Sequence, residues 1–211
     1  MYRIYKLMNT TAIKQTDKDA LDIAREYLLS GAVIAFATDT VYGIGCMVDQ
    51  ALAIERIFAI KERDKLKAIP VLIGKTGHLQ QIAQQVSATA DQLITAFWPG
   101  ALTIIVKKNP NLPQQLTGYD TVGVRMPDHE WLRQLLIICG PLAVTSANIS
   151  GQPSLSTAES VLQSLDGRID LLVDGGQCDG GIPSTVIDCT SEPVKILRDG
   201  AISKDVLKSL S

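Results

Sequence analysis

The stretch GAVIAFATDTVYGIG, residues 31–45, places a short apolar run directly before a cluster of threonine and aspartate. The run, residues 33–36, is apolar on both faces of an extended chain, which is typical of a strand buried within a sheet. Residues 17–29 before it and 49–62 after it repeat apolar positions at helical spacing. A buried strand between two amphipathic helices predicts an α/β scaffold with polar residues at a strand end, where such sheets bind ligands.

The alternation of strands and helices continues along the chain. Further strands are predicted at 69–73, 101–107, 121–126, 142–146, 169–173, 184–189 and 194–198. Further helices are predicted in two pieces over about 78–97 and at 130–139, 156–165 and 203–210. Ser156 and Glu159 have the spacing of a capping box. We expect an α/β or α+β domain around a large mixed sheet, with a mobile loop in the glycine-rich residues 174–183.

Composition narrows the class of protein. The 211 residues are 46% apolar and 20% charged, which fits one globular domain, or a domain with a small appendage. The net charge of −2 gives no overall attraction to nucleic acid or to an anionic membrane, so any such affinity needs a local patch. The four cysteines are widely spaced, which favours reduced thiols over a zinc cluster or disulfides. Without an apolar run of about 18 residues, we expect a soluble, cytoplasmic protein.

A cluster of cations lies in residues 61–67, where Lys61, Arg63, Lys65 and Lys67 outnumber the acidic residues. Basic residues at a helix end commonly form a solvated face that offsets the helix dipole. If the helix instead ends near Lys61, the side chains of Lys61 and Arg63 can enter one cleft and hold a polyphosphate. Spacing alone leaves both interpretations open.

Strand alternation over 121–126 places Thr121, Gly123 and Arg125 on one face. A bare glycine between a hydroxyl and a guanidinium leaves room for a small ligand whose carboxylate Arg125 grips with two hydrogen bonds. The alternative is a structural ion pair between Arg125 and a nearby aspartate.

The predicted strand 142–146 runs into the polar residues Ser146, Asn148 and Ser150. Polar groups at the carboxyl end of a strand are suited to ligand binding in an open α/β sheet. They are equally suited to capping the next turn, so this pattern also leaves two interpretations open.

Seven motifs together resemble one family. In order they are TDTVYGIG, K-x-R followed by Lys67, WPGALTIIV, TVGVRMPDH, PLAVTSANISG, PSTVIDCT and ILRDGAIS. They are similar to the motifs of the YrdC/TsaC threonylcarbamoyl-AMP synthases (L-threonylcarbamoyladenylate synthases), over about residues 18–202. The resemblance implies a single YrdC-like domain over 1–211, with a YrdC/RibB-like twisted mixed sheet, helices around it and a large concave basic cleft. Because the chain ends shortly after ILRDG, we expect no additional C-terminal domain.

The resemblance also implies an activity. Family members are nucleotidyltransferases that convert L-threonine, bicarbonate and ATP into threonylcarbamoyl-AMP and pyrophosphate. The product supplies N6-threonylcarbamoyladenosine (t6A) at position 37 of tRNAs that read ANN codons. The implied partners are these substrates, tRNA and downstream t6A transferase proteins, with no membrane. No aspartate pair in the sequence indicates a metal site of the protein itself, so we expect Mg²⁺ to arrive with ATP.

The motifs carry the family's residue roles onto this chain. Lys61 and Arg63 would be catalytic, acting on the phosphates during in-line attack at the α-phosphorus by N-carboxy-threonine. The implied ATP-binding residues are Lys61, Arg63, Lys67, Thr121, Ser146, Asn148, Ser154 and Arg198. The implied threonine-binding residues are Thr40, Tyr42, Arg125, Val144 through its backbone, and Ser184. The chain departs from the family pattern at Asp64, where many relatives have proline, and at Leu72, where some have a histidine near the threonine.

Two other functions compete with this one. A basic cleft can hold double-stranded RNA or tRNA without any adenylation, although aromatic residues for base stacking are only 5% of the chain. A sister enzyme of the same fold can act on another amino acid or acyl group. Pyrophosphate release that requires both L-threonine and bicarbonate would distinguish the three.

Overall fold

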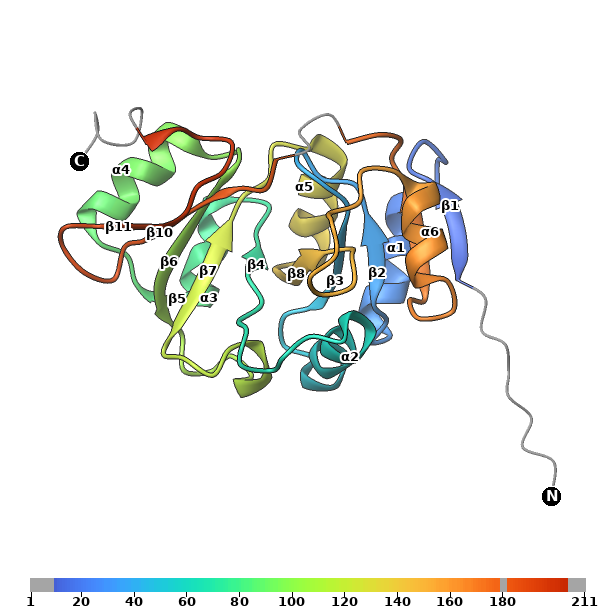
Figure 1. The fold of residues 1–211 in the computed structure, drawn as a ribbon, viewed down its shortest axis with the longest axis horizontal. Helices are drawn as coiled ribbons and strands as arrows, with labels where there is room; N and C mark the ends of the chain where they lie inside the picture. The colour runs from blue at the N-terminus through green and yellow to red at the C-terminus, as the bar shows by residue number, and fades with distance from the viewer. Residues whose placement is uncertain (1–9, 179–181, 205–211) are drawn as a thin grey trace, which may run out of the picture.

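The computed structural model describes residues 10–178 and 182–204, which form one mixed sheet with helices on both faces (Figure 1). The strands are β1 (Thr11–Lys14), β2 (Ile34–Phe36), β3 (Gly43–Met47), β4 (Val71–Leu72), β5 (Ala83–Gln85), β6 (Leu102–Lys108), β7 (Thr121–Arg125), β8 (Leu142–Ser146), β9 (Leu171–Asp174), β10 (Thr185–Asp188) and β11 (Lys195–Arg198). The helices are α1 (Ala20–Leu29), α2 (Ala51–Lys61), α3 (Leu79–Ile82), α4 (Ala88–Phe97), α5 (Glu130–Cys139) and α6 (Ala158–Leu165), with short 3-10 turns η1 (Thr76–His78) and η2 (Gln114–Leu116).

The strand order is β1-β9-β2-β3-β8-β4-β7-β6-β10-β11, and β5 pairs with β6. Parallel neighbours are β1 with β9, β9 with β2, β4 with β7, and β6 with β10, whereas the other pairs are antiparallel. The expected α/β class and mixed sheet are therefore confirmed.

Alternation along the strands divides the apolar side chains between two cores. On β2, Ala35 packs with α2 and α6, whereas Ile34 and Phe36 pack with α1 and α5. On β8, Leu142 and Val144 join the core beneath α1 and α5. The run that the sequence shows as apolar on both faces is thus buried on both faces, as expected for a strand inside a sheet.

Strand β3 was not predicted, because its sequence GIGCM is rich in glycine, which lowers strand propensity. The glycines are required by close packing between β3 and its neighbour β8. A Cβ atom on Gly45 would lie 2.8 Å from Cγ2 of Val144 and 3.3 Å from Cζ of Phe36. Strands β1 and β5 also went unpredicted, and β4 is shorter than the expected strand 69–73.

The helices match the prediction apart from their ends. The capping-box assignment was wrong: the hydroxyl of Thr157, not of Ser156, caps α6 by accepting a hydrogen bond from the amide of Ser160 at 3.3 Å. The helix expected over 203–210 falls almost entirely outside the described residues, as do residues 179–181 of the expected mobile loop. Within the described ranges, no helix has the length and apolarity to cross a membrane.

Candidate active site

A cavity of about 340 Å³ lies on the same face of the sheet as α1 and α5. Its floor is formed by residues of β4, β7, β6 and β10. Residues of opposite parity on these strands, such as Val124 and Ile104, are buried in the other core, so alternation sends Arg125, Gly123 and Thr103 into the cavity. The loop between β2 and β3 closes a further side. The lining residues are Thr38, Thr40, Val41, Tyr42, Gly43, Arg63, Ala68, Pro70, Leu72, Thr103, Ile105, Gly123, Arg125, Val144, Thr145, Ser146, Ser154, Pro183, Ser184, Val186 and Arg198.

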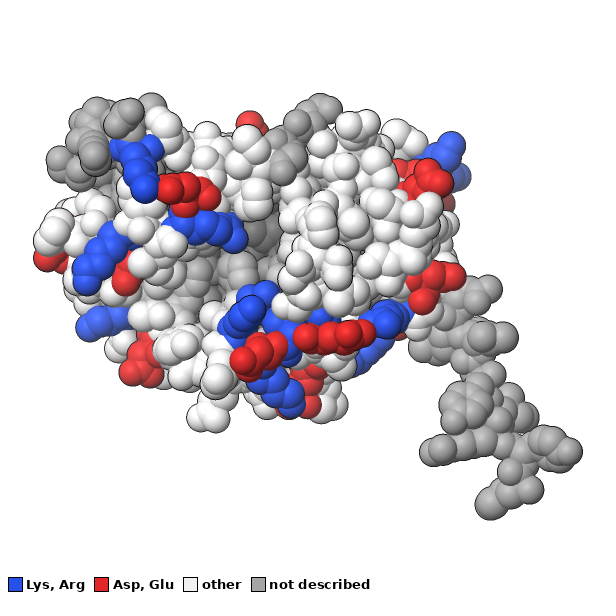
Figure 2. All heavy atoms as spheres, viewed as in Figure 1, with Lys and Arg blue, Asp and Glu red and all other residues white. Residues whose placement is uncertain are grey.

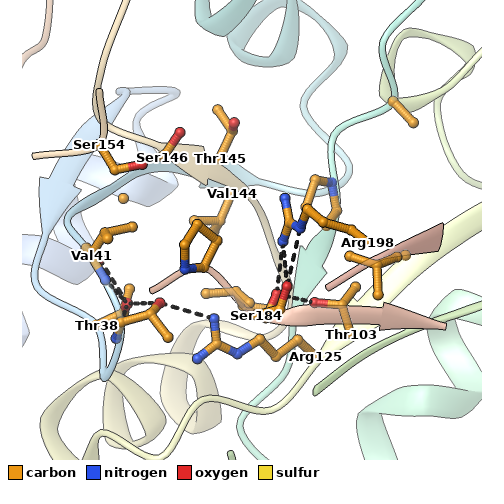
Figure 3. A pocket seen from close by; sticks show the side chains of 18 of the residues that line it. Thr38, Val41, Thr103, Arg125, Val144, Thr145, Ser146, Ser154, Ser184 and Arg198 are labelled. Atoms are coloured by element: carbon orange, nitrogen blue, oxygen red, sulfur yellow. Dashed lines mark hydrogen bonds between the residues drawn. The ribbon is translucent and has the colours of Figure 1, made fainter. Parts of the chain in front are cut away.

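Arg125 is fixed at the base of the cavity by two loops, the one between β2 and β3 and the one between α4 and β6 (Figure 3). Its Nε donates to the carbonyl of Gly100 at 2.9 Å, its Nη1 to Oγ1 of Thr40 at 3.1 Å, and its Nη2 to the carboxylate of Asp39. Burial lowers the pKa of Arg125, and the charge of Asp39 opposes that shift. Both interpretations of Arg125 are thus compatible with the geometry, because the ion pair exists and the guanidinium still lines the cavity.

Thr38 organises the loop that carries Thr40. The hydroxyl of Thr38 accepts hydrogen bonds from the amides of Thr40 and Val41 at 3.1 and 3.2 Å, donates to the carbonyl of Val41 at 2.7 Å, and lies 3.0 Å from Oγ1 of Thr40. These bonds hold the Thr40 hydroxyl next to the guanidinium of Arg125.

Tyr42 is a lining residue of the cavity, but its side chain is buried in the core and its hydroxyl is engaged elsewhere. The hydroxyl donates to the carbonyl of Gly176 at 2.7 Å and accepts from the amide of Gly175 at 3.1 Å. Burial raises the pKa of Tyr42 to about 12. Tyr42 is therefore a neutral residue that attaches the chain after β9 to the cavity wall.

A second polar network joins three strands on the opposite side of the cavity. Oγ of Ser184 lies 2.8 Å from Oγ1 of Thr103, and Nη2 of Arg198 donates to the carbonyl and hydroxyl of Ser184 at 2.8 and 3.1 Å (Figure 3). Burial, and secondarily the charge of Arg125, lowers the pKa of Arg198. Two guanidinium groups thus face one cavity, which favours an anionic ligand between them.

Of the K-x-R pair, for which the spacing left open whether both side chains enter one cleft, only Arg63 is a lining residue of the cavity. Arg63 lines the cavity and donates to the carbonyl of Ala68 at 3.0 Å, and burial lowers its pKa. Lys61 is 1% exposed and is not a lining residue. Its ammonium donates to the carbonyls of Ser146 and Asn148, and burial lowers its pKa to about 8, with a smaller contribution from Arg63.

The structure brings most of the expected site residues together. Those that line the cavity are Thr40, Tyr42, Arg63, Arg125, Val144, Ser146, Ser154, Ser184 and Arg198. Those that do not are Lys61, Lys67, Thr121 and Asn148. Lys67 is exposed and Thr121 half-buried, whereas Asn148 is buried in the turn after β8.

Sequence reasoning missed Thr38 and Thr103, which hold Thr40 and Ser184 in place. Thr38 lies in the TDTVYGIG motif, and its position two residues before Thr40 could have indicated that the two hydroxyls interact. Thr103 interrupts the apolar run of β6, and a lone hydroxyl in such a strand is the only sign of its role. Leu72, noted as a departure from the family, does line the cavity.

The charges around the site are mostly positive. Figure 2 shows Lys and Arg side chains around a hollow near the centre of this face, with acidic side chains among them along its lower edge. Arg63, Arg125 and Arg198 line the cavity, with Asp39 paired to one of them. Over residues 10–178 and 182–204, no group of three or more His, Cys, Asp or Glu side chains is placed to hold a metal ion.

Fold and site together define a mixed α/β protein with a cationic ligand cavity. The family model of Sua5, YciO and YrdC proteins, described as Telomere recombination, matches residues 26–200. The chain belongs to this family.

Known relatives agree with the family assignment. The threonylcarbamoyl-AMP synthase of Pyrococcus abyssi is 37% identical over 190 residues, which cover 89% of this chain and 56% of the relative. The synthase of Vibrio cholerae is 35% identical over 184 residues, covering 85% of this chain and 97% of the relative. The crystal structure of P. abyssi Sua5 complexed with L-threonine is similar, with a TM-score of 0.90, 34% identity and coverage of 96% of this chain and 60% of that one. The chain spans little more than half the length of the P. abyssi and Bacillus subtilis relatives.

Proposed function

We propose that this protein is a threonylcarbamoyl-AMP synthase, which converts L-threonine, bicarbonate and ATP into threonylcarbamoyl-AMP and pyrophosphate. The observation that supports it most strongly is the cavity in which Arg63, Arg125 and Arg198 surround a set of threonine and serine hydroxyls. Three guanidinium groups suit the phosphates of a nucleotide and the carboxylate of an amino acid, and the hydroxyls suit the polar groups between them. The names of the family relatives point to the same activity.

We assign the threonine side of the cavity to Arg125 and its neighbours. Arg125 uses three of its five N–H donors on described residues of the protein, which leaves donors for a carboxylate. Thr40 and Ser184 offer hydroxyls to the ligand, while Tyr42 and the backbone of Val144 shape the wall.

We assign the nucleotide side to Arg63, Arg198, Ser146 and Ser154, all of which line the cavity. Lys67 is exposed and next to the lining residue Ala68, from which position its long side chain can reach the outer phosphates.

Thr121 and Asn148, which are not lining residues of the cavity, have different roles in this proposal. Thr121 lies on the same face of β7 as Gly123, a lining residue, so it would contact the nucleotide at the edge of the site. Asn148 would contribute by shaping the turn after β8.

The chemistry requires no nucleophile from the protein. The amine of threonine attacks carbon dioxide with loss of a proton, or bicarbonate with loss of water, and the resulting N-carboxylate attacks the α-phosphorus of ATP with pyrophosphate as the leaving group. Holding the two reactants in attack geometry can supply roughly 7 to 11 kcal/mol of the barrier. Fixed guanidinium groups such as Arg63 stabilise the charge that moves onto pyrophosphate. We further propose that Mg²⁺ enters as the ATP complex, since it prefers phosphate and water oxygens as ligands.

We propose tRNA as the final acceptor of the threonylcarbamoyl group, through downstream t6A transferase proteins, and the cytoplasm as the place of the reaction. A direct contact with tRNA would use the cations around the cavity mouth. It is tested by tRNA binding at two salt concentrations, because phosphate contacts weaken steeply with salt.

The decisive experiment is pyrophosphate release from ATP by the purified protein, with L-threonine and bicarbonate omitted in turn. We expect release only when both are present, and mass spectrometry should detect threonylcarbamoyl-AMP. Pyrophosphate release that does not require threonine or bicarbonate would indicate a sister enzyme with another substrate. The absence of any release, together with tRNA binding, would favour the RNA-binding alternative.

A further inference from the structure

The side chains of Lys61 and Arg63 lie in different environments at the end of α2. The helix ends at Lys61, and Glu62 follows in the left-handed region with φ 52° and ψ 40°. This reversal lets Arg63 line the cavity while Lys61 is buried outside it. The ammonium of Lys61 donates to the carbonyls of Ser146 and Asn148, which follow each other closely at the end of β8.

Lys61 and the turn 146–152 are joined at more than one point. The backbone amide of Ser150 donates to the carbonyl of Lys61 at 2.8 Å, so the end of α2 binds the turn through both its side chain and its main chain. Within the turn, Nδ2 of Asn148 donates to two backbone carbonyls at 2.9 and 2.7 Å. The turn is therefore held together by hydrogen bonds from the Asn148 side chain within it and from Lys61 at the end of α2.

The ends of this turn reach the cavity. Ser146 lies at its start and Ser154 follows shortly after it, and both line the cavity. Any movement of the turn would displace these two hydroxyls, whereas the ammonium of Lys61 is already occupied by buried carbonyls. A phosphate could reach the ammonium only if these acceptors lost their donor, and an unpaired buried acceptor is costly.

We propose that Lys61 is a positioning residue: its ammonium fixes the turn 146–152, and through it places Ser146 and Ser154 against the nucleotide, without touching the phosphates. This inference rests on the proposed use of ATP. The lowered pKa of Lys61 is consistent with a buried amine among carbonyls. Arg63, by contrast, is the member of the pair that faces the ligand.

Equilibrium binding of adenosine, AMP and ATP to Lys61→Met and Arg63→Met separates the two roles. We expect Lys61→Met to weaken all three ligands by a similar factor of about tenfold, because a displaced turn affects the nucleoside as well. Arg63→Met should weaken ATP more than adenosine. Lys75→Met removes an exposed lysine outside the cavity and serves as the control, with affinities like those of the wild type. If the loss of affinity in Lys61→Met grows from adenosine to ATP, Lys61 contacts the phosphates. If the affinities are unchanged, Lys61 has no positioning role. Either result overturns the proposal.

A measurement on the wild-type protein covers the case in which Lys61→Met does not fold. Acetylation of lysines, followed by mass spectrometry, should label Lys61 at least about tenfold more slowly than Lys75, since access requires breaking the buried contacts. Saturating adenosine, AMP and ATP should slow labelling of Lys61 by similar factors, because each ligand stabilises the closed turn. Labelling as fast as at Lys75 without nucleotide, or protection that grows from adenosine to ATP, would overturn the proposal. If the wild type does not bind ATP at all, the proposed function fails, but the labelling rate without nucleotide still decides whether Lys61 is held in the turn.

Discussion

The guanidinium of Arg125 is held by Gly100, Thr40 and Asp39, so its planar fork has one fixed orientation. Lysine would provide a point charge without the fork. We therefore expect Arg125→Lys to be nearly as harmful as Arg125→Ala, with a rise of about tenfold or more in the KM for threonine. The measurement is bicarbonate-dependent pyrophosphate release over a range of threonine concentrations.

A matched control for Arg125→Lys is Arg168→Lys. Arg168 forms an ion pair with Glu62 at 2.9 Å, but the two side chains are 44% and 63% exposed. The conservative change there should leave the threonine KM unaltered, because exposed pairs contribute little. A wild-type response to threonine in Arg125→Lys would show that Arg125 is only a structural partner of Asp39.

Selectivity among amino acids depends on the hydroxyls of the cavity. Serine lacks only the methyl group of threonine, and losing one such group from a pocket costs about 1 to 3 kcal/mol. Valine would leave the hydroxyls of Thr40 or Ser184 unpaired in a desolvated site, which is a larger loss. We expect the order threonine, serine, valine in kcat/KM. A kcat/KM for valine equal to that for serine would mean that the pocket does not recognise the hydroxyl.

At the scale of elements, a substitution in β3 can test whether its close packing against β8 supports the cavity wall. A Cβ on Gly45 would lie 2.8 Å from Cγ2 of Val144 and 3.1 Å from the carbonyl of Ala143. We expect Gly45→Ala to lower the free energy of unfolding by about 1 to 3 kcal/mol, because the side chain of Val144 and the backbone must both shift. Gly118→Ala is the control, since no atom beyond its chain neighbours lies within 4 Å of its added Cβ. Urea denaturation of both variants decides the point: equal stabilities would contradict the packing argument.

The same element shows why local sequence reasoning succeeded for some strands and failed for others. Residues 142–146 were predicted to the residue, because the apolar run from Leu142 to Val144 leads into the polar residues Thr145 and Ser146 at the end of β8. The glycines of β3 have low intrinsic strand propensity, and only their contact with Val144 explains them. The cap of α6 was assigned one residue early because Ser156 and Thr157 are both good caps, and it is Thr157 that accepts the hydrogen bond from Ser160.

At the scale of the whole molecule, the buried amine of Lys61 links stability to pH. Its pKa falls from 10.5 to about 8 on folding, so between these values the unfolded chain holds more protons than the native protein. The free energy of unfolding therefore gains a contribution that rises with pH over this window. We expect the stability of the wild type relative to Lys61→Met to increase by on the order of 1 to 3 kcal/mol from pH 8 to pH 10.

The comparison with Lys61→Met is needed because other groups act in the opposite direction. Burial raises the pKa of Cys46, Cys189 and Tyr42 to about 12, so the native protein keeps these protons after the unfolded chain has lost them. Their contribution to stability falls as the pH rises, but it is common to both proteins and cancels in the difference. A difference that stays constant with pH would mean that Lys61 is not buried as an amine.

The sequence by itself determined the mixed α/β class, most of the helices and strands, and the family, because these depend on local periodicity and on motifs that lie in continuous stretches. It also supplied Arg125 and its two possible roles. Only the tertiary structure decided that Asp39 pairs with Arg125, that Thr38 and Thr103 support the cavity, and that Lys61 and Arg63 separate. These facts depend on contacts between distant segments and on one left-handed residue at the end of α2, which no local pattern in the sequence encodes.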